Sequence, residues 1–410
     1  MTHTEDDLAR IFRAESGQVI AALISYSKDI DLAEDAFQDA CLQAINKWPK
    51  DKPDNKPAWL FTVAKRRLID RIRQSTFRNK QQTLQHILDS LPEQSESELN
   101  SHIPDERLKL IFTCCHPALS KSAQVALTLK TLCGLKISEI ARAFLTTEVS
   151  MSQRITRAKK KIKLAGIPYK VPDKTIMPER IDSVLNVIYL IFNESYSAFE
   201  GQTLTRDDLA QEAIRLSRLL TQLTPQANVF GLLSLMLFHY SRRFARSSEK
   251  QRFIPLEFQD RKLWDRGLII QADQILEKAM KYKQPESFQI QAAISSLHSS
   301  AKSWQETDWK QILLLYQSLY RINNSPIVAL NYNVAIAHSG DLAASLKRLN
   351  SLEKELDKYQ PFYASRAYVY LKLKQNKKAK KDFEVAIKMT KNSIQRDYLK
   401  SQLKLCESSI

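Results

Sequence analysis

The chain has 410 residues, of which 43% are hydrophobic, and this is enough for two or three domains with buried cores. Its 7 glycines are far fewer than an average chain of this length carries, which favours helices and excludes the glycine-rich phosphate loops of nucleotide-dependent enzymes. The net charge of +17 favours an anionic partner. We therefore predict an all-α protein that is not an enzyme and needs no cofactor.

The distribution of charged and apolar residues predicts a cytoplasmic protein whose middle segment meets an anion. Residues 1–100 have a net charge of −2, residues 101–173 of +8 and residues 174–410 of +11. No apolar signal segment begins the chain and no run of about 18 apolar residues follows, so we expect no membrane span. The 5 cysteines are scattered and odd in number, which predicts reduced thiols.

Residues 31–48, "DLAEDAFQDACLQAINKW", predict an amphipathic helix. Its core-facing stripe, with apolar residues at three- and four-residue steps, consists of Ala33, Ala36, Phe37, Ala40, Cys41, Ala44, Ile45 and Trp48. The opposite face is acidic with one apolar side chain, and it consists of Asp31, Asp35, Gln38, Asp39 and Leu42. This face is either an ordinary solvated helix surface or a docking site for a basic partner.

Residues 56–80, "KPAWLFTVAKRRLIDRIRQSTFRNK", predict a second helix with a basic surface, which Pro57 suits as a first-turn residue. An apolar seam at four-residue steps is formed by Leu60, Ala64, Leu68 and Ile72. The basic cluster comprises Lys65, Arg66, Arg67, Arg71 and Arg73, and Arg78 and Lys80 continue it. Basic residues beside Trp59, Phe61 and Phe77 suit phosphates and unstacked bases, although we favour core positions for Trp59 and Phe61.

The segment from residue 81 to residue 168 divides into a linker and a helix-turn-helix. Residues 81–104 are polar and acidic and lack periodicity, as a linker would. Residues 120–163 then give a helix, a stop at Gly134, a second helix, a short turn and a third helix. Ser150 and Gln153 have the spacing of a capping pair at the start of that third helix.

The third helix of this motif, in "VSMSQRITRAKKKIK", holds six basic residues and no acidic one. The spacing of Met151, Ile155, Ala158 and Ile162 turns these four residues toward a core. Stacked like charges destabilise an isolated helix, so an anion such as DNA phosphate is expected to compensate. We predict base contacts from Ser152, Gln153, Thr156 and Arg157, and phosphate contacts from Arg154, Lys159, Lys160 and Lys161.

Taken in this order, these segments resemble the sigma-70 family of bacterial RNA polymerase specificity subunits, and most closely its compact extracytoplasmic-function group. "DLAEDAFQDA" is similar to the family segment that docks on the polymerase clamp, "AWLFTVAKRRLIDRIRQ" to the segment that reads and opens the −10 element, and "ISEIARAFLTTEVSMSQRITRAKKKI" to the −35 reader. Arg66 stands where the family often has Asn, which puts promoter preference at that site in doubt. The resemblance also implies a role for the acidic linker, because a negatively charged strand can occupy a channel that otherwise holds RNA. A plain flexible tether explains its composition equally well.

The second half of the chain predicts a succession of amphipathic helices. "DERLKLIFTCCHPALS", "YLIFNESYSAFEG" and "VALNYNVAIAHSGDL" resemble a sigma subgroup whose long carboxy-terminal extension contains tetratricopeptide-like helices. Two late hairpins overlay with a shift of about 35 residues that matches Ala344 with Ala379, close to the 34-residue tetratricopeptide period. Stacked helix pairs build binding surfaces, so we expect a regulatory role with a protein or ligand partner, or a contact with polymerase.

Three candidate chemical sites in the sequence are discounted or left open. Cys114, Cys115 and His116, with Cys133 beyond, invite a zinc interpretation, but no C-x-x-C pair completes a ligand set and buried thiols are favoured. Glu194 lies among apolar residues without a catalytic partner, which favours a structural carboxylate. His239 with Arg242 and Arg243 predicts either a site for a phosphorylated or acidic ligand or an interhelical ion pair.

The sequence therefore predicts a transcription initiation factor that binds core RNA polymerase and promoter DNA. Residues 1–80 would form a sigma region 2-like domain, residues 81–104 the acidic linker, residues 105–168 a region 4-like domain, and residues 174–410 the helical extension. The alternatives are a stand-alone helix-turn-helix regulator with a sensing repeat domain and, less favoured, a repeat scaffold with accidental basic helices. Replacing Asp35 and Asp39 distinguishes a sigma factor from a stand-alone regulator, because only the sigma factor needs them to bind polymerase.

Overall fold

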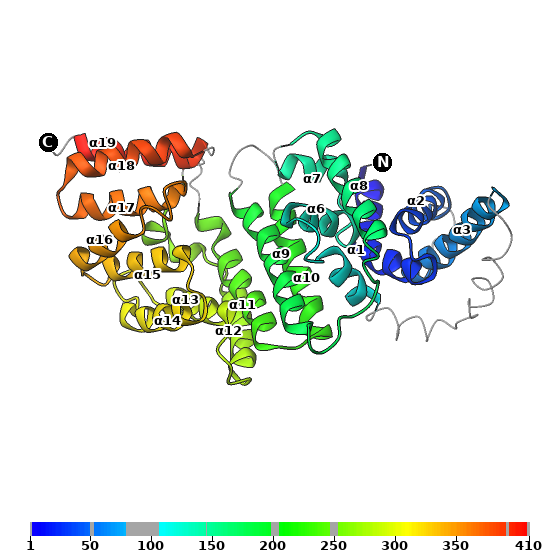
Figure 1. The fold of residues 1–410 in the computed structure, drawn as a ribbon, viewed down its shortest axis with the longest axis horizontal. Helices are drawn as coiled ribbons and strands as arrows, with labels where there is room; N and C mark the ends of the chain where they lie inside the picture. The colour runs from blue at the N-terminus through cyan, green and yellow to red at the C-terminus, as the bar shows by residue number, and fades with distance from the viewer. Residues whose placement is uncertain are drawn as a thin grey trace. The chain divides into compact units, whose positions relative to one another are not determined.

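The computed structural model describes residues 2–49, 53–78, 106–144, 146–197, 205–246, 253–390 and 393–407. Within these ranges the structure is helical and has no β-strand, which confirms the all-α prediction (Figure 1). The predicted linker, residues 81–104, lies outside the described residues. The chain forms two compact units, Met1–Glu194 and Ser195–Ile410, and each is described by itself.

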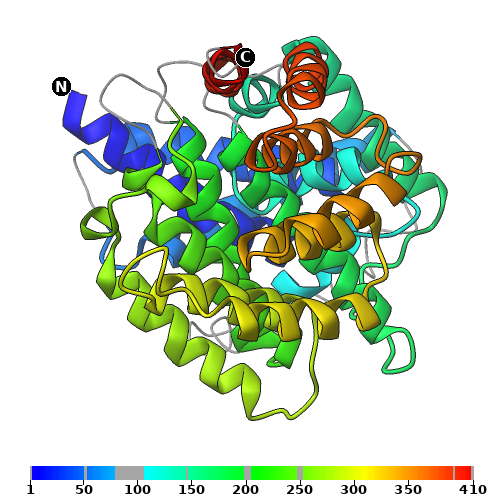
Figure 2. The ribbon, with the colours of Figure 1, turned by 90° about the vertical axis from the view of Figure 1, so that its left-hand side faces the viewer.

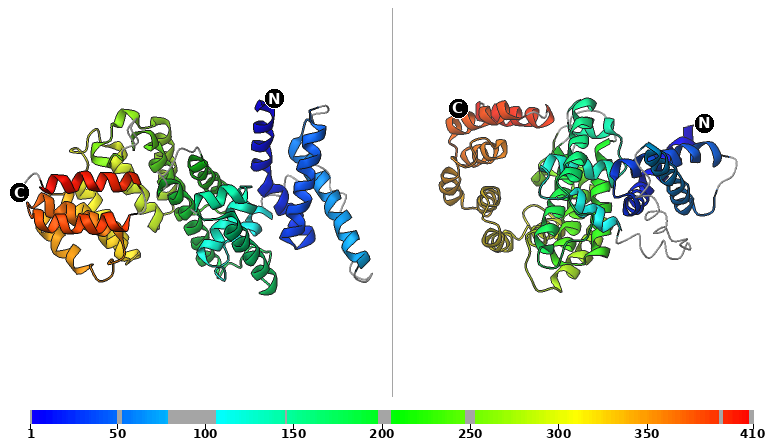
Figure 3. Two further views of the ribbon diagram at one scale, coloured as in Figure 1. Left: turned by 90° about the horizontal axis from the view of Figure 1, so that it is seen from above. Right: turned by 45° about the vertical axis from the view of Figure 1, so that its right-hand side comes forward.

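Unit 1 begins with a bundle of three helices, α1 (Thr2–Ser27), α2 (Ile30–Lys47) and α3 (Lys56–Arg78) (Figure 3). The Asp29 carboxylate caps α2 by accepting from the backbone N–H groups of Asp31 and Leu32. Small side chains in the predicted stripe of α2 let the helices approach closely, since Ala33, Ala36, Ala40 and Ala44 are all fully buried. Ile45 is an exception, because its side chain is 47% exposed rather than in the core.

The seam of α3 packs against α2 largely as its spacing predicts. Leu60, Ala64 and Leu68 are buried completely or almost so, whereas Ile72 is half-buried. Phe61 is also buried, and half-buried Trp59 makes an edge-to-face contact with Trp48 at 5.5 Å between ring centroids. A core position is therefore confirmed for Phe61 and only partly for Trp59.

The second part of unit 1 contains a helix over residues 106–114, α6 (Lys121–Thr131), α7 (Ile137–Ala143), α8 (Glu148–Leu164) and α9 (Met177–Ser197). Gly134 adopts a positive φ of 66° between α6 and α7, as the predicted stop requires. The predicted capping pair is wrong. Thr147 caps α8, because its hydroxyl accepts from the backbone N–H of Ser150 at 3.1 Å and leaves Ser150 inside the helix.

Unit 2 is a series of helical hairpins (Figures 1 and 2). It contains α10 (Thr205–Leu223), α11 (Ala227–Ser241), α12 (Arg266–Met280), α13 (Ser287–Ser300), α14 (Trp309–Ile322), α15 (Pro326–His338), α16 (Leu342–Ser351), α17 (Gln360–Lys372), α18 (Asn376–Met389) and α19 (Ser393–Glu407). In the described residues between α11 and α12 lie three short 3₁₀ turns, Arg243–Ala245, Leu256–Phe258 and Arg261–Leu263. Gly231 lets α11 approach α13 so closely that an added Cβ would lie 2.4 Å from the Gln289 backbone nitrogen.

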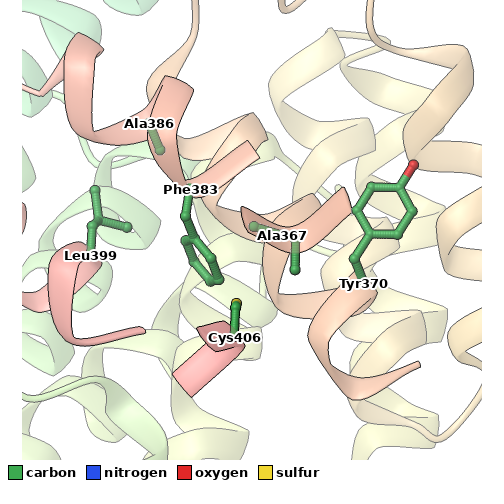
Figure 4. Packing of buried hydrophobic residues seen from close by; sticks show 7 residues of the cluster. Ala367, Tyr370, Phe383, Ala386, Leu399 and Cys406 are labelled. Atoms are coloured by element: carbon green, nitrogen blue, oxygen red, sulfur yellow. The ribbon is translucent and has the colours of Figure 1, made fainter. Parts of the chain in front are cut away.

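The last two hairpins repeat with a period of 34 residues rather than about 35. Helix α15 begins at Pro326 and α17 at Gln360, while α16 begins at Leu342 and α18 at Asn376. The buried small residue equivalent to Ala379 is therefore Ser345, and the predicted match with Ala344 is one residue out of register. Ala367, Tyr370, Phe383, Ala386, Leu399 and Cys406 form the core of the final hairpin and α19 (Figure 4).

Candidate nucleic-acid interface

The outward face of α8 presents basic and polar side chains that suit a nucleic acid. Met151, Ile155 and Ala158 are buried as predicted, and Ile162 is half-buried. This orientation leaves Gln153, Thr156, Arg157, Lys160 and Lys161 exposed, with Ser152 and Arg154 half-buried. Both the exposed and the half-buried members of the predicted set therefore reach solvent.

A shallow hollow of about 430 Å³ lies between α8 and the start of α6. Its α8 side is basic, with Arg154, Arg157 and Lys161, while Ser120 and Ser122 bring hydroxyl groups from the α6 end. Ser120 caps α6, so this end also carries the positive end of a helix dipole. Guanidinium, ammonium and hydroxyl groups beside a helix amino terminus make a suitable environment for a phosphate.

The opposite edge of α8 contacts α2 through Lys159, which is nearly buried, and Lys163, which stays largely exposed. The Lys159 ammonium lies 2.8 Å from Asp31 Oδ1 and 2.9 Å from Glu34 Oε2, and Lys163 Nζ lies 3.0 Å from Asp29 Oδ2. Burial on its own would lower the pKa of Lys159, but the Glu34 and Asp31 carboxylates outweigh it and raise the pKa, so the side chain remains charged. In this structure Lys159 is therefore engaged within the protein and not available to a phosphate.

The acidic face of α2 is exposed as predicted, but a cation from α3 partly neutralises it. Arg71 places Nη1 3.1 Å from Asp35 Oδ2 and Nη2 2.8 Å from Asp39 Oδ2. The hydrogen bond to Asp39 is the main cause of a raised pKa of Arg71. Arg71 thus joins the predicted polymerase-binding residues of α2 to the predicted DNA-binding cluster of α3. Leu42, 61% exposed, and Gln38 lie open on the same face.

The remaining basic residues of α3 differ in exposure. Arg66, Arg67 and Arg73 are exposed. Lys65 is half-buried and lies over the Tyr26 ring at 5.0 Å from its centroid, and burial lowers its pKa. The side chains of Phe77 and Arg78, and all of Lys80, lie outside the described residues. Three of the five predicted cations in the α3 cluster are thus presented to solvent.

Glu34 is a functional candidate that sequence reasoning missed. Its side chain is buried on α2, where Oε1 accepts a hydrogen bond of 3.0 Å from the Thr131 hydroxyl of α6 and Oε2 meets Lys159. A carboxylate directly beside Ala33 and three residues before Phe37 interrupts the apolar stripe, and that interruption was the available signal.

Two family matches coincide with these surfaces. Residues 11–78 match sigma-70 region 2, and residues 109–162 match sigma-70 region 4. The chain belongs to the sigma-70 family. Residues 180–280 match a family of unknown function, DUF6596, so this sigma factor carries a helical carboxy-terminal extension.

One relative resembles this sigma factor along nearly its whole length. An uncharacterised protein of Rhizobium meliloti (strain 1021) is 40% identical over 393 residues, which cover 94% of this chain and 92% of that protein. No solved structure matches. Sigma factors are transcription initiation proteins that act with core RNA polymerase on promoter DNA, and these are the partners that the region 2 and region 4 matches imply. In the described parts of the chain, no helix is long and apolar enough to cross a membrane.

The cysteine cluster of the sigma factor consists of buried thiols. Cys114, Cys115 and Cys133 are buried, and Cys115 Sγ lies 3.6 Å from the Thr128 hydroxyl. Burial raises the pKa of Cys115 to about 12, which disfavours the thiolate that metal binding needs. His116 uses Nδ1 to accept from the backbone N–H of Ala118 at 3.2 Å. No group of three or more potential metal ligands occurs among the described residues.

The arginine pair after α11 is explained in part by an ion pair. Arg243 Nη1 lies 3.6 Å from Asp265 Oδ2 at the start of α12, and His239 Nε2 lies 3.3 Å from the Ser295 hydroxyl of α13. Burial lowers the pKa of His239, which keeps the imidazole neutral. These contacts favour the ion-pair interpretation for Arg243. The Glu194 side chain lies outside the described residues.

Proposed function

We propose that this sigma factor is of the extracytoplasmic-function type and acts in the cytoplasm, where it directs core RNA polymerase to promoters. The acidic face of α2 (Asp31, Asp35, Gln38, Asp39 and Leu42) binds polymerase, α3 reads the −10 element, and α8 reads the −35 element. The supporting observation is that one compact unit carries an exposed acidic face on α2 and an exposed, mainly basic face on α8, where the carboxylate of Glu148 lies in the first turn. A stand-alone regulator has no need of the first face.

The test is to mix the purified full chain with bacterial core polymerase. We expect the two to comigrate, and we expect the complex to make run-off transcripts from DNA that the complex itself selects. Direct DNA binding without polymerase association would instead favour the stand-alone regulator.

The contacts of α8 with DNA predict a salt dependence. Each phosphate neutralised by a lysine contributes about 0.9 to the slope of log affinity against log salt concentration. Lys160→Gln/Lys161→Gln should therefore reduce the slope for promoter binding by the holoenzyme by about 2 and weaken all promoters alike. Lys170→Gln/Lys174→Gln, which removes two exposed lysines beyond α8, is the matched control and should leave the slope unchanged. Equal slopes for both double variants would argue against phosphate contacts from α8.

The helical extension would regulate this activity as a tetratricopeptide-like domain that receives a protein or ligand. Its support is the 34-residue repeat of α15 to α18 and the net charge of +11 over residues 174–410. A truncation that tests this role must keep α9, because α9 packs on the region 4 segment. The Arg180 guanidinium donates to the Phe112 carbonyl at 2.6 Å, and the Ser183 hydroxyl donates to the Cys115 carbonyl at 3.0 Å.

A chain that ends at Ser197 retains α9 and removes the rest of the extension. We expect its promoter-directed transcription to change by several-fold relative to the full chain, in cells and with purified protein. Unchanged transcription in both settings would remove the support for a regulatory role. A chain that ends at residue 173 is the control for the cut itself, because losing α9 would expose the buried region 4 core and reduce folding.

A further inference from the structure

We propose that the carboxy-terminal end of unit 2 is a second DNA-binding surface, which holds the phosphate backbone of duplex DNA without regard to its sequence. The surface centres on the lysine row, which we define as Lys377, Lys381 and Lys388 of α18. This inference goes beyond the proposed function, because the surface lies wholly in the helical extension and its test needs no polymerase.

The positive charge of the extension is concentrated at its end. Residues 372–410 contain 11 lysines and arginines and 4 acidic residues, so they carry +7 of the extension's net charge of +11. Asp382, one of the four, is buried and paired with Arg366, so its charge does not offset the surface lysines. Among the residues whose exposure the structure describes, only Glu384 and Asp397 of this segment are exposed carboxylates. The surface therefore has a large excess of positive charge.

The helical periodicity of α18 gathers its lysines on the side away from the core. Ala379, Phe383 and Ala386 are buried in the cluster that α18 shares with α17 and α19 (Figure 4). At about 100° per residue the lysine row lies on the opposite side of the helix, and all three of its side chains are exposed. At about 1.5 Å per residue the row is about 16 Å long, which spans about five steps of a DNA strand. The row can therefore reach several phosphates.

The folded extension supplies little counter-charge for the lysine row. Within the described part of the chain, none of its three ammonium groups forms an ion pair with a carboxylate. Glu353 is the carboxylate that Lys381 influences, and its pKa is lowered mainly by its hydrogen bond with Arg366 and less by Lys381. Lys377 and Lys381 are four residues apart, where like charges destabilise a helix. Lysines that gain little within the fold favour an anionic partner outside it.

The surroundings of the lysine row suit a duplex backbone better than a protein or a single strand. Protein interfaces have an apolar centre, and single-strand sites use aromatic rings on which bases stack. In the described residues of α17 and α18, no large apolar or aromatic side chain is exposed. The Tyr368 ring meets the Lys372 ammonium at 5.3 Å, and the buried Tyr370 ring meets that of Lys378 at 5.6 Å. Ammonium groups on such a surface bind phosphates as point charges and read no bases.

Titration of random-sequence duplex DNA with the full chain, at several salt concentrations, tests this surface. Lys377→Gln/Lys381→Gln/Lys388→Gln should lower the slope of log affinity against log salt concentration by about 2–3, because each phosphate contact contributes about 0.9. Its affinity at physiological salt should fall about 10-fold or more. Lys377→Arg/Lys381→Arg/Lys388→Arg keeps the three charges and should keep both values. An unchanged slope in the glutamine variant would overturn the proposal.

Lys278→Gln/Lys302→Gln/Lys310→Gln is the matched control, because it removes the same charge from three other exposed positions of unit 2. Lys302 and Lys310 have the exposed carboxylates of Glu306 and Asp308 nearby in the sequence, so their charge is already offset. The control should leave the slope unchanged. An equal decrease in the control would show that net charge, rather than the lysine row, determines binding, and this too would overturn the proposal.

Acetylation of lysines in the full wild-type chain locates the contact without any substitution. Duplex DNA should slow the acetylation of the lysine row about 5-fold or more, because an ammonium bound to phosphate is withheld from the reagent. Lys302 and Lys310 should react at the same rate with and without DNA. Equal acetylation of the row in both conditions would overturn the proposal. A glutamine variant that loses core polymerase but keeps duplex DNA would assign the row to an acidic protein surface instead. Failure of the wild-type chain to bind polymerase would contradict the sigma mechanism alone, because the DNA titration contains no polymerase.

Discussion

Asp35→Lys/Asp39→Lys should reduce the affinity of the chain for core RNA polymerase about 100-fold or more. The substitution reverses two charges on the acidic face of α2 and sets two lysines against Arg71. Charged residues at the centre of an interface often contribute 2 kcal/mol or more, and replacing an attractive charge with a repulsive one adds to that loss. Comigration with polymerase and a titration of run-off transcription measure the effect.

Two controls separate polymerase binding from folding. Asp54→Lys/Asp70→Lys makes the same charge change at exposed carboxylates away from the acidic face of α2. Arg71→Gln breaks the same ion pairs but keeps both carboxylates, so its polymerase association should persist. Wild-type affinity in Asp35→Lys/Asp39→Lys would contradict the docking role. Equal loss in Arg71→Gln would show that the ion pairs themselves are needed.

Arg366→Met should destabilise unit 2 by about 3–5 kcal/mol, as measured by chemical denaturation of the full chain. Arg366 on α17 donates through Nε to Asp382 Oδ2 at 2.6 Å and through Nη2 to Asp382 Oδ1 at 3.0 Å. Both side chains are almost completely buried, at 7% and 6% exposure. Burial would lower the pKa of Arg366, but Asp382 and Glu353 raise it, so the guanidinium is charged. The substitution leaves the Asp382 carboxylate buried without its main partner.

The double variant Arg366→Met/Asp382→Leu distinguishes an unpaired charge from lost packing. A buried ion pair replaced by apolar residues of similar size is often neutral in stability, so the double variant should recover most of the loss. Glu353→Gln, which removes a 53% exposed partner of the same arginine, should cost less than about 1 kcal/mol. A double variant as unstable as Arg366→Met would indicate that side-chain packing, rather than charge, is decisive here.

The local patterns of this sequence determine its helices and most of their buried faces. The spacing of Met151, Ile155 and Ala158 is enough to orient α8, because a helix fixes side-chain direction at about 100° per residue whatever its cap. The error in predicting Ser150 as the cap therefore did not change which side chains of α8 were predicted to face outward. The repeat period was predicted one residue too long. Ala344 and Ser345 are adjacent and both small, so the sequence alone did not show which of them aligns with Ala379.

The tertiary structure alone decided which charged groups meet. Lys159 and Asp31 are 128 residues apart, and the Arg71 side chain reaches α2 from α3, so no local pattern relates them. A sequence shows which residues carry charge but not which opposite charge is within 3 Å, because that depends on how separate helices pack. Family membership could therefore be predicted from motifs, while the ion pairs that join α8 and α3 to α2 required the folded unit.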